Sequence, residues 1–224
     1  MVSVAFHPSS SETGVRRHPG RPDREDDAVP RPTPARLRAS VCVAPAMLLL
    51  LLAALVHPAP AQAASLPSKS QWVADTYDAM QGSRAYVGRR VDQGGSRLAV
   101  NLDIDNTSLA SHYDYGAPVA VTLRFARYAR DHGVKLLFNT GRIRGDGRLA
   151  KAKDLLRAAG YRVTEICGRT STHETLTHSK QRCRRHFVAE GWTLVANVGN
   201  RQSDFTGGSY EKAFRLPSYG GRLA

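Results

Sequence analysis

The sequence lacks an apolar run long enough to span a membrane. Its apolar run, residues 46–56, is centred on six consecutive residues from Met47 to Leu52, whereas a spanning helix needs about 20 apolar residues. The sequence also has no internal repeat and no recognised nucleic-acid-binding motif. These absences argue against a stable membrane span and against specific recognition of nucleic acid.

Residues 1–63 lack lysine and hold nine of the 12 prolines. This composition predicts disorder over residues 1–44. The apolar run follows Arg36 and Arg38 and precedes Ala61-Gln62-Ala63, an order typical of a secretory signal peptide; a membrane anchor or a buried helix are the alternatives. We expect residues 1–63 to be a disordered n-region plus signal peptide, and residues 64–224 to be one secreted or extracytoplasmic domain.

Cysteine is scarce, and acidic residues are fewer than basic ones. Of the three cysteines, only Cys167 and Cys183 would remain after cleavage; outside the cytoplasm they can form a disulfide or stay as two thiols. The formal net charge is +13. Such a charge attracts phosphate esters, nucleic acid or an anionic cell envelope, and it does not choose among them.

Predicted strands and helices alternate along the remaining chain. A helix over 68–91 is followed by strands at 97–102, 134–138, 161–166 and 192–198, with helices at 118–130, 147–159 and 179–189 between them. This alternation predicts right-handed βαβ units in a three-layer α/β/α fold with a parallel central sheet. Ligands of such sheets bind at the carboxyl ends of the strands.

Polar side chains stand at these strand ends. Asp103 and Asp105 follow the first strand. A carboxylate can attack phosphorus, and a second one nearby can transfer the protons. Thr140 and Gly141 follow the second strand, and Lys180 begins the last helix; all three can bind phosphoryl oxygens. Asp204 follows the last strand and can help to hold Mg²⁺.

Each feature also has a simpler interpretation. The acidic pair can belong to a capped turn, Thr140 can cap a helix, Lys180 can be a solvated cation and Asp204 a turn residue. A calcium loop starting at Asp103 is disfavoured, because Ser108 stands where that loop requires glycine.

Four segments together resemble the haloacid dehalogenase (HAD) superfamily, in its secreted acid phosphatase branch (subfamily IIIB-like), which includes plant vegetative storage proteins. Residues 103–107 (DIDNT) are similar to its Asp-x-Asp-x-Thr signature, and residues 138–142 (FNTGR) to its second motif. Residues 180–184 (KQRCR) resemble the Lys-x-x-x-Arg motif, and residues 191–205 resemble the fourth. The resemblance covers residues 68–218.

The resemblance implies a role for each matching residue. Asp103 would be the nucleophile and Asp105 the acid/base. Thr140, Gly141 and Lys180 would bind the phosphate of a small phosphorylated substrate. Mg²⁺ would be held by Asp103, the backbone carbonyl of Asp105, and the fourth-motif residues Asn200 and Asp204. The short interval between Asp105 and Thr140 implies a small cap or none.

One position departs from the branch, which usually has aspartate where this chain has Asn200. Asparagine keeps an oxygen ligand and removes a charge. Arg201 adds a positive charge beside it. We therefore expect an exported, Mg²⁺-dependent phosphomonoesterase, with a weakened storage-type or phosphate-binding protein as the first alternative and a basic nucleic-acid-binding module as the second. His112, Tyr113 and Tyr115 can line a substrate pocket or simply pack their loop.

Overall fold

The computed structural model describes residues 65–223. The expected signal peptide and n-region, residues 1–63, lie outside these residues. The elements, in chain order, are α2 (Lys69–Ala79), α3 (Ser83–Asp92), β1 (Leu98–Leu102), α4 (Ala120–Asp131), β2 (Lys135–Ile143), α5 (Arg148–Ala158), β3 (Glu165–Arg169), α6 (Leu176–Ala189), β4 (Thr193–Gly199), the 3-10 helix η2 (Gln202–Asp204) and β5 (Lys212–Arg215). None of the described helices has the length and apolar character needed to cross a bilayer.

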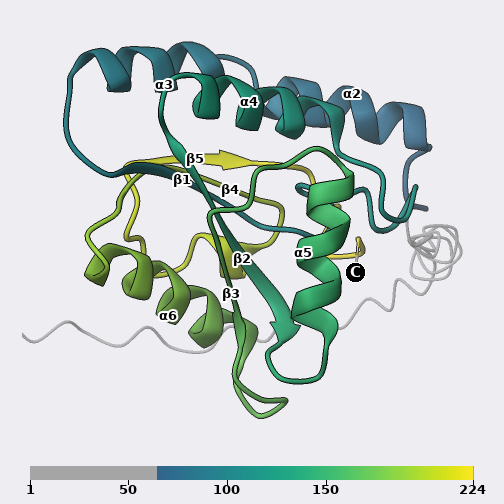
Figure 1. The fold of residues 1–224 in the computed structure, drawn as a ribbon. Helices are drawn as coiled ribbons and strands as arrows, with labels where there is room; N and C mark the ends of the chain where they lie inside the picture. Colours follow the sequence, from purple (N-terminus) through teal and green to yellow (C-terminus); the bar gives the residue numbers. More distant parts are fainter. Residues whose placement is uncertain (1–64, 224) are drawn as a thin grey trace, which may run out of the picture. The chain divides into compact units, whose positions relative to one another are not determined.

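The five strands form one parallel sheet in the order β3-β2-β1-β4-β5 (Figure 1). The chain builds outward from β1 to β2 and β3, and then returns through α6 to place β4 on the other side of β1. The direction in which successive strands are added to the sheet therefore reverses between β1 and β4. The crevice at such a switch point is where doubly wound sheets bind their ligands.

Helices cover the two faces of the sheet unequally. The larger core joins α2, α3, α4 and α5 to one face, with Trp72, Phe125, Phe138 and Leu156 almost fully buried. The smaller core lies under α6, where Phe187 packs with Leu137 and Leu194. Figure 1 shows α6 alone on its side of the sheet. The expected three-layer α/β/α fold with a parallel sheet is confirmed.

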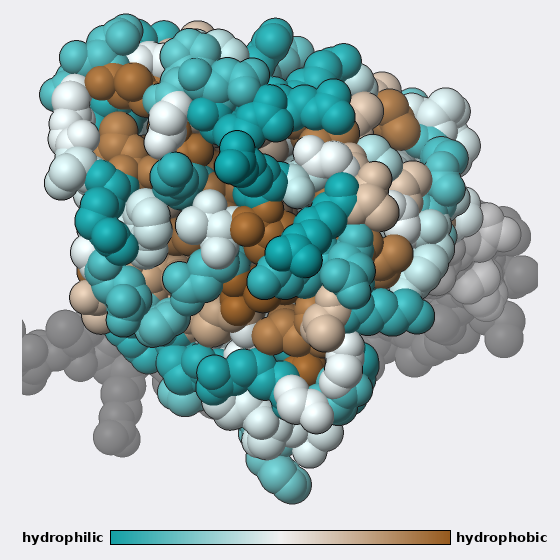
Figure 2. Space-filling view, in the orientation of Figure 1, coloured by the Kyte–Doolittle hydropathy of each residue, from teal (hydrophilic) through white to brown (hydrophobic). Residues whose placement is uncertain are grey.

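The outer surface of this domain carries few large apolar side chains. In the view of Figure 2, hydrophobic surface appears as patches divided by hydrophilic side chains. Among the described residues, only Tyr115 and Val188 are large hydrophobic residues that are well exposed. Apolar residues are thus used mainly to build the two cores.

Several element boundaries differ from those expected. The helix expected over 68–91 is two helices, because Gly82 adopts a left-handed conformation with φ of 71°. The third strand begins at Glu165 rather than at Tyr161, whose side chain is buried in the core and donates to the Ser108 carbonyl at 2.9 Å. Helix α6 begins three residues earlier than expected, at Leu176, and β5 was not expected at all.

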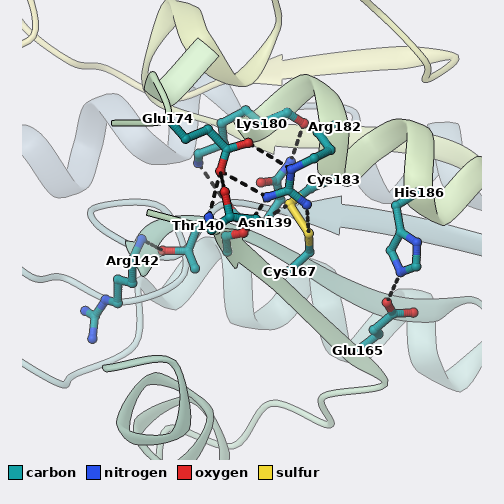
Figure 3. Close-up of a disulfide and its surroundings, with 12 residues drawn as sticks. Asn139, Thr140, Arg142, Glu165, Cys167, Glu174, Lys180, Arg182, Cys183 and His186 are labelled. Carbon is teal, nitrogen blue, oxygen red and sulfur yellow. Dashed lines mark hydrogen bonds and ion pairs between the residues drawn. A yellow bond between two sulfur atoms is a disulfide. The ribbon is translucent and has the colours of Figure 1, made fainter. Parts of the chain in front are cut away.

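A disulfide joins Cys167 on β3 to Cys183 on α6, with Cα atoms 5.6 Å apart. The sequence left open whether these cysteines pair, and the structure decides for the bridge. Cys183 lies less than one helical turn beyond Lys180 (Figure 3). The bridge therefore attaches the part of α6 that carries Lys180 to the sheet.

Replacing both cysteines by alanine should lower the free energy of unfolding by about 3 kcal/mol, because a loop of this length loses that much closure entropy when cross-linked. The difference in the free energy of unfolding is measured by denaturant unfolding of the wild type and the variant in the absence of reductant. With reductant, the two proteins should become nearly equal. A variant as stable as oxidised wild type would contradict the expectation.

Candidate active site

The carboxyl ends of β1, β2 and β4 bring the expected site residues together. Asp103 follows β1, Thr140 lies near the end of β2, and Asn200 follows β4. The backbone N–H of Asp103 donates to the Val198 carbonyl at 2.9 Å, so β1 and β4 stay paired up to the site. Because β1 lies between β2 and β4, Asp103 stands at the centre.

The Asp103 carboxylate is buried and held by its own loop. Thr107 donates its hydroxyl to Asp103 Oδ2 at 3.0 Å, and the Ser108 hydroxyl donates to the Asp103 backbone carbonyl at 2.6 Å. Asn106 has φ of 55°, which makes the turn that returns Thr107 to the carboxylate. This local structure orients Asp103 before any ligand binds.

Lys180 reaches Asp103 from α6. Its ammonium donates to Asp103 Oδ1, to Asp204 Oδ1 at 2.6 Å and to the Asn139 carbonyl at 2.9 Å. The lysine is 4% exposed, so three charged groups share a buried space. Thr175 caps the helix by accepting from the His178 N–H at 3.2 Å, which fixes where α6 begins.

Burial and neighbouring charges act on the pKa values of this cluster. Burial, together with the charges of Asp204 and Asp105, raises the pKa of Asp103 to about 7, against the lowering effect of Lys180. Burial by itself would lower the pKa of Lys180, but the two carboxylates outweigh it and the pKa lies above its ordinary value. The lysine is therefore an ammonium, and an added cation beside Asp103 would favour its carboxylate form.

Asp105 is held apart from this cluster by Arg142. The guanidinium donates to both carboxylate oxygens, Nη2 to Oδ1 at 2.6 Å and Nε to Oδ2 at 3.2 Å, and the Ser111 hydroxyl donates to Oδ1 at 2.6 Å. Burial raises the pKa of Asp105, but these hydrogen bonds outweigh it and the pKa lies below its ordinary value. Asp105 is thus a partly exposed carboxylate at the mouth of the site.

Thr140 lies in the second half of β2, beside Lys180 (Figure 3), and Gly141 follows it in the same strand. Thr140 is fully buried, and its hydroxyl accepts from the Arg142 N–H at 3.3 Å. Asn139, directly before it, donates its side-chain amide to the Lys180 carbonyl at 2.9 Å. The second motif and α6 are therefore joined by hydrogen bonds in both directions.

Asp204 lies over Gly199 at the end of β4. Its Oδ2 accepts from the backbone N–H groups of Asn200 and Arg201 at 3.1 and 2.8 Å. A Cβ at position 199 would lie 2.5 Å from the Asp204 side chain, so only glycine allows this approach. The other oxygen, Oδ1, is left to face Lys180 and Asp103.

The residues present fit a hard divalent cation. Among residues 65–223, no three His, Cys, Asp or Glu side chains cluster as metal ligands. Nevertheless, one oxygen each of Asp103 and Asp204 converges on a single cation, the Lys180 ammonium. The buried Asn200 amide has no hydrogen-bond partner for either polar atom. Two carboxylates and an unsatisfied amide oxygen are a donor set suited to Mg²⁺, which keeps several waters.

Arg184 clamps the loop that carries Asp204. It is fully buried on α6, one turn after Lys180, and its guanidinium donates to the carbonyls of Asp204, Thr206 and Gly208 at 2.5–2.7 Å. Burial lowers the pKa of Arg184. One helix thus positions both the Lys180 ammonium and the loop of Asp204.

Some contacts in the site were not expected from the sequence. Arg142 pairs with Asp105, and Thr107 with Asp103. All four residues belong to the first or second sequence motif, so the motifs could have suggested these contacts. Arg184 is also a residue of the third motif. Its acceptors, however, are backbone carbonyls, which no residue type in the sequence identifies. Tyr113 packs its loop, stacking on Trp72 at 4.9 Å between ring centroids, while its hydroxyl donates to the Pro67 carbonyl at 2.7 Å.

Two comparisons with known proteins found a match, one to a family model and one to a solved structure. Residues 116–222 match the family model described as HAD superfamily, subfamily IIIB (acid phosphatase). The class C acid phosphatase from Bacillus anthracis has a similar structure, with a TM-score of 0.54 and 17% sequence identity; the match covers 67% of this chain and 79% of that one. At this identity the likeness speaks for the fold. A search of the curated proteins found no match.

Replacing Arg184 by methionine should loosen the loop that holds Asp204. The carbonyls of Thr206 and Gly208 are partly buried and would lose this donor, while the Asp204 carbonyl would keep the Asn197 amide as its donor. Each lost partner costs about 1–3 kcal/mol, partly offset because an unpaired buried charge is removed. We expect a net loss of about 2–4 kcal/mol in the free energy of unfolding and faster amide hydrogen exchange over residues 203–208.

The matched control is Arg185→Met, one position along α6 on its exposed side. This variant should change neither quantity. Unchanged hydrogen exchange over residues 203–208 in Arg184→Met would show that the guanidinium does not hold the loop.

Proposed function

The chain belongs to the HAD superfamily, in its acid phosphatase branch (subfamily IIIB), and on that premise we propose that it is an exported phosphatase that forms a phospho-enzyme on Asp103 and needs Mg²⁺. The broader activity, hydrolysis of phosphoric monoesters, follows from the family. The proposal of a phospho-enzyme on Asp103 is supported by one observation. Lys180 forms buried ion pairs with both Asp103 and Asp204 at the switch point of the sheet.

In the first step, an Asp103 oxygen attacks the phosphorus of the substrate. A bond forms between that oxygen and phosphorus, the ester P–O bond breaks, and the leaving alcohol oxygen takes a proton from Asp105. Lys180, the Thr140 hydroxyl and the backbone N–H near Gly141 bind the phosphoryl oxygens. The lowered pKa of Asp105 favours its protonated form only at acidic pH, in keeping with an acid phosphatase.

In the second step, water hydrolyses the aspartyl phosphate. Asp105, now a carboxylate, takes a proton from the water as its oxygen attacks phosphorus. The bond between phosphorus and Asp103 breaks, which restores the Asp103 carboxylate and releases inorganic phosphate. Arg142 holds Asp105 in reach of both steps.

Asp103, the Asp105 backbone carbonyl, Asn200 and Asp204 would hold Mg²⁺. A bound Mg²⁺ would neutralise charge on the carboxylates and on the phosphoryl oxygens. The buried Asn200 amide without a partner supports this placement. With asparagine in place of aspartate, the ion has fewer anionic ligands and depends more on the charge of the substrate.

We place the enzyme outside the cytoplasm. The basic, apolar and small-residue order before residue 64 supports export, and so does the disulfide between Cys167 and Cys183, since such bridges persist in oxidising compartments. The partner is a small phosphorylated substrate. The net charge of +13 favours loose association with an anionic cell envelope over recognition of a specific nucleic acid.

Release of inorganic phosphate from a panel of phosphomonoesters, with Mg²⁺ and with a chelator, tests the proposal. Wild type should release phosphate only with the metal. Asp103→Asn should lose at least about 10⁴-fold in turnover, as expected when a nucleophile is removed, and Asp105→Asn about 10²–10⁴-fold.

The matched control is Asp114→Asn, an exposed carboxylate further along the same loop that pairs with Lys69. It should retain full activity. Asp103→Asn activity within a few-fold of wild type, in a folded protein, would remove Asp103 from the nucleophile role. A storage-type protein would release no phosphate in any variant.

Asn200→Asp should lower the Mg²⁺ concentration needed for half-maximal activity by about tenfold, because an added carboxylate strengthens a site for a hard cation. The preferred substrates should stay the same. The Mg²⁺-dependent rise of the thermal unfolding midpoint, measured without substrate, should appear at lower metal concentration. If the variant needs as much Mg²⁺ as wild type in both titrations, Asn200 does not face the metal.

A further inference from the structure

Two arginines at the catalytic cavity have no part in the proposed chemistry. Six charged side chains line this cavity: Asp103, Asp105, Arg142, Arg148, Lys180 and Arg201. Two buried carboxylates share the Lys180 ammonium, and Arg142 pairs with Asp105 at 2.6 Å. Arg148 and Arg201 belong to neither of these pairings, and the attack on phosphorus and the hydrolysis of the phospho-enzyme use neither of them.

Arg201 is a cation at this cavity without an acidic partner. No carboxylate of residues 65–223 lies within ion-pair distance of its guanidinium. Its Nη2 donates to the Leu223 backbone carbonyl at 3.1 Å, and the side chain is partly exposed. A guanidinium has five N–H donors, so the bond to Leu223 fixes the group and leaves most of its donors to solvent or to a ligand.

The contact with Leu223 directs the Arg201 guanidinium away from Lys180. Leu223 is buried in the larger core, on the face of the sheet that α2 to α5 cover. The segment before it is attached to the same layer, because the Tyr219 hydroxyl donates to the Asp75 carboxylate on α2. Lys180 enters the site from α6, on the other face. The two cations therefore approach the cavity from opposite sides.

Arg148 approaches from the same side as Arg201. It is the first residue of α5, which packs on the larger core through Ala152 and Leu156. Its Nε donates to Asp146 Oδ2 at 2.6 Å, but 61% of the side chain is exposed. Since an exposed ion pair contributes little free energy, Arg148 can bind another anion at small cost.

The alcohol of the substrate lies where these arginines are. Asp105, at the mouth of the site, protonates the leaving oxygen in the proposed reaction, so the alcohol bonded to that oxygen extends from Asp105 toward the open side of the cavity. A guanidinium presents parallel N–H donors that match two oxygens of a carboxylate or a phosphate. An anionic group on the alcohol thus gains charge-assisted hydrogen bonds that a neutral alcohol does not.

We infer that Arg201 and Arg148 form a second anion-binding subsite, which makes the enzyme selective for phosphomonoesters whose alcohol carries a further anionic group, a carboxylate or a second phosphate. The inference rests on the proposed phosphatase function. It assigns the two arginines to the leaving alcohol, whereas Lys180, Thr140 and Gly141 bind the reacting phosphoryl group. Because the subsite contacts a part of the substrate that does not react, its effect falls mainly on KM.

The test compares 3-phosphoglycerate with glycerol 3-phosphate at saturating Mg²⁺, since these esters are nearly equal in size and differ in one carboxylate. Wild type should have a kcat/KM at least about tenfold higher for 3-phosphoglycerate, the scale of a hydrogen bond to a charged group. Arg201→Gln and Arg148→Gln should each lower this ratio by at least about threefold, because each removes part of the subsite. Adenosine 3′,5′-bisphosphate and adenosine 5′-monophosphate form the corresponding pair for a second phosphate. A preference in either pair supports the subsite and identifies the anion that it binds.

The matched control is Arg157→Gln, which removes the same charge from the exposed surface of α5 outside the cavity. Its ratio should equal that of wild type, which separates the subsite from general attraction by the net charge. Arg201→Lys keeps the charge but loses the parallel donors, so its ratio should lie between those of wild type and Arg201→Gln.

Thermal unfolding establishes that each variant is folded, and the exposed Arg148 provides an independent arm if Arg201→Gln is not. A wild type without preference in either pair, or a ratio that no folded variant of the two arginines lowers, overturns the inference while the phosphatase function stands. Equal losses on both esters of a pair belong to that second outcome, since they would place the arginine on the reacting phosphoryl group. No phosphate release from any of the four esters by wild type would instead overturn the proposed function.

Discussion

The site depends on one buried ammonium. Lys180 lies between Asp103 and Asp204, and without it two carboxylates would face each other in a space from which water is nearly excluded. Burying like charges costs several kcal/mol unless an opposite charge with good hydrogen bonds offsets them. Every element around the site serves this arrangement: Thr175 sets the start of α6, the disulfide attaches it to β3, and Gly199 allows Asp204 to approach.

The same arrangement explains why asparagine at position 200 is compatible with the fold. The pocket already holds two carboxylates against one ammonium, with the Arg142–Asp105 pair beside it. A third carboxylate would raise the cost of folding without metal, whereas an amide is neutral. The unsatisfied amide of Asn200 is a smaller cost, of about 1–3 kcal/mol. The neutral amide thus leaves the folded protein less strained than a third carboxylate would.

The sequence predicted the parallel α/β fold and the convergence of Asp103, Thr140, Lys180 and the fourth motif, because each follows a strand or opens a helix. It could not predict β5, a four-residue strand without strong periodicity. Nor could it predict that Leu223, at the end of a segment with no regular structure, is buried in the larger core. Its position depends on long-range contacts with Arg201 and Asp75, and such contacts leave no local pattern.

The placement of α6 has a consequence for the order in which this protein acquires activity. Cys167 and Cys183 are only 16 residues apart, so β3 and α6 can be joined while the chain is still being assembled into a sheet. By contrast, the Lys180–Asp103 contact spans 77 residues, and Asp204 comes 24 residues after Lys180. Contacts of such separation form late, because they require long loops to close. A partly folded chain can therefore hold its helix and bridge before the site exists, and the cluster of Asp103, Lys180 and Asp204 is complete only when β4 docks beside β1.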